Sequence, residues 1–295
     1  MFEEFKNAFQ RYNNAHVQLI LINVAVFVVL GVLMVVSEIG GASAVYSFIH
    51  DQFSIPARID QFITRPWTIL TYAFMHAGFL HILFNMLVLY WFGRLFVEYL
   101  GSDKLIAVYF LGAISGGVLY LLAYNTVPYF VTQSNQAVIM MVGASAAVDA
   151  IVVAAATLLP DYTFFLLLLG PVRIKYIAAV TVFLSFLGTV GGNAGGNIAH
   201  LGGALIGFIY IKQLQAGSNW GSWITATIEW FKGLFKPRPK VKVTYRSDAP
   251  RKKTQTKSSS VSQEELDAIL DKISDGGYES LTKEEKEKLF NASKK

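Results

Sequence analysis

Four long stretches of this chain carry no Asp, Glu, Lys or Arg, and they constrain the fold more than any other feature. They cover residues 17–37, 66–93, 105–148 and 176–211. A helix needs about 20 apolar residues to cross the hydrocarbon layer of a membrane. The first two stretches therefore suit one helix each, and the two longer ones suit two each. With 54% hydrophobic residues, the chain is expected to be an all-α polytopic membrane protein.

Polar turns at 125–136 and 188–197 divide the two longer stretches. We therefore predict six membrane-spanning helices. They lie near residues 17–36, 78–98, 104–124, 143–159, 174–190 and 197–215.

The distribution of Lys and Arg predicts the orientation of these helices. Basic residues flank the connections after the second and fourth helices and also follow the sixth helix. They include Arg94, Lys104, Arg173, Lys175 and Lys212. The connections 125–142 and 188–197 have none. Because cytoplasmic connections are enriched in Lys and Arg, we expect both termini on the cytoplasmic side of the cell's inner membrane.

The residues after the sixth helix divide into three segments. Residues 217–235 place Trp223 and Phe231 on one helical side against Glu229 and Lys232, which predicts an amphipathic helix in the membrane interface. Residues 236–260 are rich in Lys, Arg, Ser and Pro, so we expect a disordered basic linker.

Residues 261–295 regain helical signals. Ser262 with Glu265, and Thr282 with Glu285, are two capping-box patterns. We expect a small cytoplasmic helical hairpin here.

The composition excludes several kinds of chemistry. There is no cysteine, so disulfides, thiol nucleophiles and thiolate metal sites are excluded. Nothing in the sequence indicates a cofactor or a metal. The net charge of +5 suits the anionic headgroups of a lipid bilayer, and nucleic acid is not an expected partner.

Polar side chains inside membrane helices are costly, so each one points to a role. The second helix holds His76, His81 and Asn85, the fourth opens with Gly143, Ala144 and Ser145, and the sixth contains His200. In the predicted topology these three helices run inward, and the residues lie early in each helix. We therefore expect a Ser, His and Asn cluster at one depth, on the outer side of the bilayer.

These residue types fit acyl transfer. A Ser hydroxyl becomes a nucleophile when a neighbouring imidazole takes its proton. The Asn amide, the second His and the backbone N–H of Ser145 are candidate donors to the resulting oxyanion.

Three motifs occur in this order along the chain: His76-x4-His81-x3-Asn85, Gly143-Ala144-Ser145, and Ala199-His200-Leu201-Gly202-Gly203 with Gly207. Together they resemble the rhomboid family of intramembrane serine proteases, of a bacterial six-helix type with a cytoplasmic C-terminal tail.

The resemblance makes residues 1–216 a rhomboid-like membrane domain. It implies that Ser145 is the nucleophile and His200 its base, with His81, Asn85 and Ser145 forming the oxyanion hole. It further implies a serine endopeptidase that cleaves single-pass transmembrane proteins near the outer leaflet.

Two residues depart from the family pattern. Ala146 stands where a glycine usually follows the serine, and we expect small partners such as Gly202 or Gly203 to accommodate its methyl group. Asp149 lies one turn below Ser145, where the family often has an aromatic ring. It is either a third member of a catalytic triad or a structural carboxylate.

The roles of four polar residues and the function of the whole chain have alternatives. His76 and Asn197 are expected to support the site, and His81 with Asn85 also fits a structural clamp between helices. An inactive rhomboid-like protein that binds or routes membrane proteins is the alternative function. The sequence leaves the substrate and the oligomeric state open.

Overall fold

The computed structural model describes residue 11 and residues 13–166, 169–235 and 262–293. The chain forms two units, Met1–Pro237 and Arg238–Lys295.

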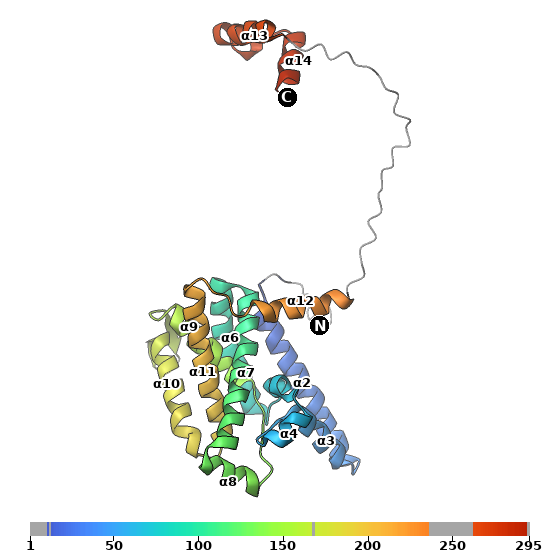
Figure 1. Ribbon diagram of the computed structural model, residues 1–295, viewed down its shortest axis with the longest axis vertical. Coiled ribbons are helices and arrows are strands. Elements are labelled where there is room, and N and C mark those ends of the chain that lie inside the picture. Colours follow the sequence, from blue (N-terminus) through green and yellow to red (C-terminus); the bar gives the residue numbers. More distant parts are fainter. Residues whose placement is uncertain (1–10, 12, 167–168, 236–261, 294–295) are drawn as a thin grey trace. The chain divides into compact units, whose positions relative to one another are not determined.

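Each of the six segments predicted to cross the membrane contains a helix in the structure. The six helices are α2 (Ala15–Ile39), α6 (Phe79–Leu100), α7 (Ser102–Thr126), α9 (Ser145–Leu158), α10 (Ile174–Leu187) and α11 (Ala194–Gln215). Figure 1 shows α6, α7, α9, α10 and α11 running side by side, with α2 inclined to them.

Four helices among the described residues are long and apolar enough to cross a membrane: α2, α6, α7 and α11. The apolar segments Ser145–Leu158 and Ile174–Val190 are shorter. A polytopic all-α membrane fold is thus confirmed, whereas the count of six spans stays a prediction.

Shorter elements connect the long helices. Between α2 and α6 lie α3 (Ser43–Phe53), β1 (Ile55–Pro56), α4 (Ile59–Thr64), α5 (Thr68–Thr71) and η1 (Tyr72–Phe74). Between α7 and α9 lie α8 (Pro128–Gln136) and β2 (Met140–Met141), and η2 (Gly188–Val190) follows α10. Strands β1 and β2 pair antiparallel, with Ile55 opposite Met141. This pairing joins the segment before α9 to the long connection after α2.

A second pair of strands, which the sequence analysis did not predict, lies between α9 and α10. Strand β3 (Thr163–Leu166) pairs antiparallel with β4 (Gly170–Arg173). The ring of Phe164 stacks on Phe92 of α6, with 4.8 Å between centroids. The Lys175 ammonium and the Arg173 guanidinium both bind Asp161 and hold the pKa of its carboxyl below the usual range.

Glycines bring α11 into close contact with α9. A Cβ atom on Gly203 would overlap the backbone oxygen of Ala146, and one on Gly207 would overlap that of Ala150. Small residues let helix backbones approach in this way, and van der Waals packing then holds the helices together.

The methyl group of Ala146 is accommodated by a different helix from the one predicted. A Cβ on Gly116 of α7 would come within 2.6 Å of the Ala146 Cβ. Gly203 instead faces the Ala146 backbone, and Gly202 faces the backbone of Ser115. The partner is thus a small residue, as predicted, but it is Gly116 where Gly202 or Gly203 had been named as examples, because α9 packs against α7 as well as α11.

Helix α12 (Ser222–Phe235) follows α11 and packs against the beginning of α7, where Gly221 lies close to Ala107. Its exposed side carries Trp223, Trp230 and Phe231. The helix is thus amphipathic, and its location in the membrane interface stays a prediction.

The second unit contains α13 (Gln263–Gly276), η3 (Tyr278–Ser280) and α14 (Lys283–Ala292). Both capping boxes are formed, at Ser262 and at Thr282. Two ion pairs join the helices, Lys272 with Glu285 at 2.9 Å and Lys288 with Glu265 at 3.2 Å. The predicted linker, residues 236–260, lies outside the described residues.

The contact between Gly203 and Ala146 predicts a large cost for one added methyl group. Gly203→Ala should destabilise the membrane unit by about 1–3 kcal/mol, because a backbone atom must move. The measurement is the thermal unfolding midpoint of the purified protein in detergent.

Gly31→Ala on α2 is the matched control, because its Cβ meets no atom within 4 Å. Equal unfolding midpoints for Gly203→Ala and Gly31→Ala would contradict this account of the packing.

Candidate active site

Ser145 and His200 face each other across the contact between α9 and α11. The Ser145 Oγ lies 2.6 Å from the His200 Nε2. Ser145 is the first residue of α9, and His200 lies in the second turn of α11. Gly203, one turn after His200, allows the close approach of the backbones at Ala146. The short distance between hydroxyl and imidazole thus follows from the packing of the two helices.

The other ring nitrogen of His200 has two oxygen neighbours. The Ser185 Oγ of α10 forms a hydrogen bond with Nδ1 at 3.2 Å. The Asp149 Oδ2 lies 3.5 Å from the same nitrogen. Ser185 was not singled out in the sequence analysis. The available signal was a hydroxyl in the largely apolar run 176–187, where Tyr176 and Thr181 also carry hydroxyls, and a serine in such a helix often bonds only to its own helix.

His81 and Asn85 lie on one face of α6, next to Ser145. The Asn85 Nδ2 donates to the backbone oxygen of His81 at 2.9 Å. An amide nitrogen has two N–H donors, so one remains for another acceptor. The backbone N–H of Ser145 lies at the start of α9, where helical N–H groups have no partner within the helix.

One cavity of about 440 Å³ brings most of the predicted site residues together. Its polar part consists of His81, Asn85, Ser145, Asp149 and His200, with Asn193 beside them. The rest is largely apolar and includes Leu80, Phe84, Val88, Phe92, Val148, Val152, Ile177 and Thr181. The polar end can position a peptide bond, and the apolar walls suit hydrophobic side chains.

Gly143 allows His81 to approach Ser145. Its φ of +141° favours glycine, and a Cβ there would lie 2.9 Å from the His81 Cε1. The Gly143 N–H also donates to the backbone oxygen of Tyr72 at 3.0 Å. This bond ties the segment before α9 to the segment that leads into α6.

The two predicted supporting residues lie beside the cavity and do not line it. The His76 ring contacts the His81 ring edge-on, with 5.1 Å between centroids. The Asn197 Nδ2 donates to the backbone oxygens of Gly188 and Asn193, at 3.0 and 2.9 Å. Asn197 therefore connects the beginning of α11 to the turn before it.

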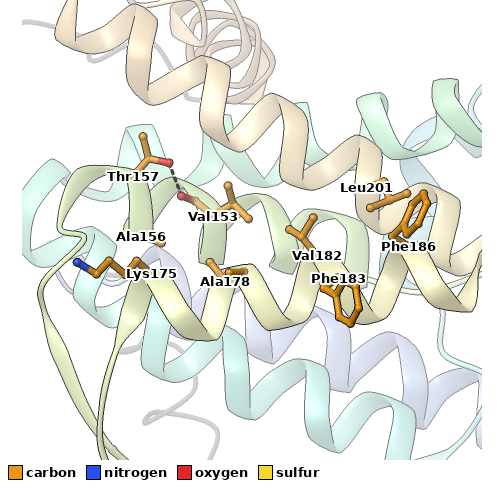
Figure 2. Close-up of a pocket in the computed structure, with 10 residues that line it drawn as sticks. Val153, Ala156, Thr157, Lys175, Ala178, Val182, Phe183, Phe186 and Leu201 are labelled. Carbon is orange, nitrogen blue, oxygen red and sulfur yellow. Dashed lines mark hydrogen bonds between the residues drawn. The ribbon is translucent and has the colours of Figure 1, made fainter.

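A larger groove of about 660 Å³ lies between α9 and α10 (Figure 2), and its chemistry is different. Its lining is mostly apolar, with Val153, Val182 and Phe183 among the residues drawn. The Thr157 hydroxyl donates to the backbone oxygen of Val153 at 2.7 Å, and Lys175 binds Asp161. In this groove the Thr157 hydroxyl and the Lys175 ammonium are thus already bonded to other protein groups. The candidate active site is therefore the smaller cavity.

Comparison with known proteins identifies the family. The sequence matches the Rhomboid domain over residues 64–215. It is also 30% identical over 178 residues to RHOMBOID-like protein 12, mitochondrial, of Arabidopsis thaliana. This chain belongs to the rhomboid family, as the sequence motifs predicted.

The aligned region has limits that bear on function. It covers 58% of this chain and 52% of the Arabidopsis protein, so the match spans about half the length of that relative. Residues 257–295 match a family of unknown function, DUF6576.

Proposed function

We propose that this rhomboid-family chain is an intramembrane serine endopeptidase. The observation that carries the proposal is the 2.6 Å contact between the Ser145 hydroxyl and the His200 Nε2. A hydroxyl bonded to a neutral imidazole is the arrangement that serine nucleophiles require. The pair lies in a bundle of apolar helices, so the substrate is a protein that itself lies in the membrane.

In the proposed first step the Ser145 Oγ attacks the carbonyl carbon of the peptide bond and His200 Nε2 takes its proton. The C–N bond then breaks, and His200 gives that proton to the departing amine. The remaining acyl group is an ester on Ser145. Water attacks the ester, His200 again accepts and returns a proton, and the acid product leaves.

The carbonyl oxygen becomes an oxyanion when the carbonyl carbon is attacked, and it needs hydrogen-bond donors already in position. In the proposed site these are the free N–H of the Asn85 amide, the His81 ring and the backbone N–H of Ser145. All three residues line the same cavity. His76 and Asn197 act only by holding the segments around them.

Asp149 is proposed as a third member of the site. Its Oδ2 lies 3.5 Å from the His200 Nδ1, and the residue is only 9% exposed. A carboxylate at this distance stabilises the imidazolium that forms when His200 accepts a proton.

The proposed substrates are single-pass transmembrane proteins, cleaved near the outer leaflet. The proposed setting is the inner membrane of the cell with both termini cytoplasmic, on the basis of the Lys and Arg distribution. The Arabidopsis relative is named as mitochondrial. In the same orientation α12 lies in the cytoplasmic interface, with Trp223, Trp230 and Phe231 among the lipid.

The alternative is a rhomboid-like protein that binds membrane proteins without cleaving them. A binding protein does not require the hydrogen bond between the Ser145 hydroxyl and the His200 imidazole. Nor does it require the two oxygen atoms, from Ser185 and Asp149, that lie near the His200 Nδ1. These contacts favour the protease.

Ser145→Ala and His200→Ala should each abolish cleavage of a model transmembrane substrate, because one removes the nucleophile and the other its base. The measurement is product formation by purified protein in detergent or liposomes. Ser134→Ala is the control, since the Ser134 hydroxyl bonds only backbone oxygens of Tyr124 and Val131. Turnover retained by Ser145→Ala or His200→Ala would exclude the mechanism.

Asn85→Ala should slow cleavage without eliminating it. Loss of one oxyanion donor costs roughly 10²–10³ in kcat, while the nucleophile remains. Steady-state kinetics on the same substrate measure the effect. A kcat equal to that of the wild type would make Asn85 a structural residue.

Asp149→Asn keeps the shape of the side chain and removes its charge. Because a carboxylate stabilises the imidazolium, we expect kcat to fall at least about tenfold with KM little changed. The test is kcat across pH 6–9. A mutant as fast as the wild type throughout that range would show that Asp149 has no part in catalysis.

A further inference from the structure

Ser185 makes the closest polar side-chain contact to Nδ1 of His200, the ring nitrogen on the edge opposite the nucleophile. Its Oγ lies 3.2 Å from Nδ1, while Nε2 on the opposite edge of the ring lies 2.6 Å from Ser145. Ser185 is only 4% exposed. The imidazole is thus held between two serines that come from different helices, α9 and α10.

The chemistry of the ring determines what Ser185 does. His200 Nε2 must be free of a proton to accept one from Ser145, so in the neutral imidazole the proton lies on Nδ1. That N–H needs an acceptor, and the Ser185 Oγ is within hydrogen-bond distance. The Asp149 Oδ2 is farther, at 3.5 Å. The Ser185 hydroxyl can therefore accept the Nδ1–H hydrogen bond of the neutral His200 imidazole. The Asp149 carboxylate can stabilise the His200 imidazolium that forms after proton transfer.

Ser185 does not line the cavity that contains Ser145 and His200. It reaches the reaction only through the histidine ring. Three residues of its helix, α10, are buried, namely Ile174, Ala178 and Ser185. Ala178, Val182 and Phe183 of the same helix line the apolar groove shown in Figure 2. The hydrogen bond between Ser185 and His200 is a direct polar side-chain contact between α10 and α11.

We propose that Ser185 is a positioning residue that fixes the tautomer and the ring plane of His200 and so keeps Nε2 directed at Ser145. The proposal rests on the proposed protease function. Without the Ser185 hydroxyl the ring loses its nearest Nδ1 partner, and the tautomer with the proton on Nε2 becomes more populated. That tautomer cannot accept a proton from Ser145.

The experiment compares the wild type with Ser185→Ala, which removes the hydroxyl, and with Ser185→Thr, which keeps one. The matched control is Thr157→Val, since the Thr157 hydroxyl bonds only the Val153 backbone of its own helix. For each purified protein one measures the rate at which a fluorophosphonate modifies Ser145, kcat and KM for a transmembrane substrate, and the thermal unfolding midpoint.

We expect Ser185→Ala to lower both kcat and the fluorophosphonate rate by about three- to tenfold, the range of a single hydrogen bond, with KM unchanged. Ser185→Thr should recover most of the rate, and Thr157→Val should behave as the wild type. The unfolding midpoint of Ser185→Ala should stay close to that of the control, which separates positioning from a general loss of stability.

Two results would overturn the assignment. One is a Ser185→Ala protein that reacts with the fluorophosphonate as fast as the wild type. The other is a Ser185→Thr protein as slow as Ser185→Ala while both keep the wild-type unfolding midpoint. A wild-type protein that does not react at all would instead refute the protease function.

Discussion

The close contact between α9 and α11 is the constraint on which the rest of this structure depends. Gly203 lies against the backbone oxygen of Ala146 so tightly that a methyl group has no room. Because Ser145 and His200 are neighbours of this contact along their helices, it sets the 2.6 Å separation of hydroxyl and imidazole. Stability and proposed chemistry therefore rely on the same few small residues.

Much of this arrangement was predictable from the sequence. Charge-free runs located the helices because the cost of charge in hydrocarbon is large. His81, Asn85, Ser145 and His200 stood out for the same reason, and the Rhomboid domain match confirms the family that their motifs predicted. The roles assigned to these residues stay predictions until they are tested by mutation.

Other features depend on packing between distant segments, and a local pattern does not reveal them. The methyl group of Ala146 lies against Gly116, because α9 has two neighbours and the sequence does not say which one the side chain faces. Ser185 resembles any hydroxyl in an apolar helix until α10 is placed beside His200. The pairing of β1 with β2 joins segments that are far apart in the chain, and each strand is too short to show a period.

The central claim is that Ser145 is an activated nucleophile in a membrane protein, and one measurement tests it most directly. The wild-type protein is treated with a fluorophosphonate in detergent, digested, and mapped by mass spectrometry for phosphonylated serines. The account predicts an adduct on Ser145, none on Ser134 or Ser185, and no adduct in His200→Ala. An unmodified Ser145, or modification that persists without His200, would contradict it.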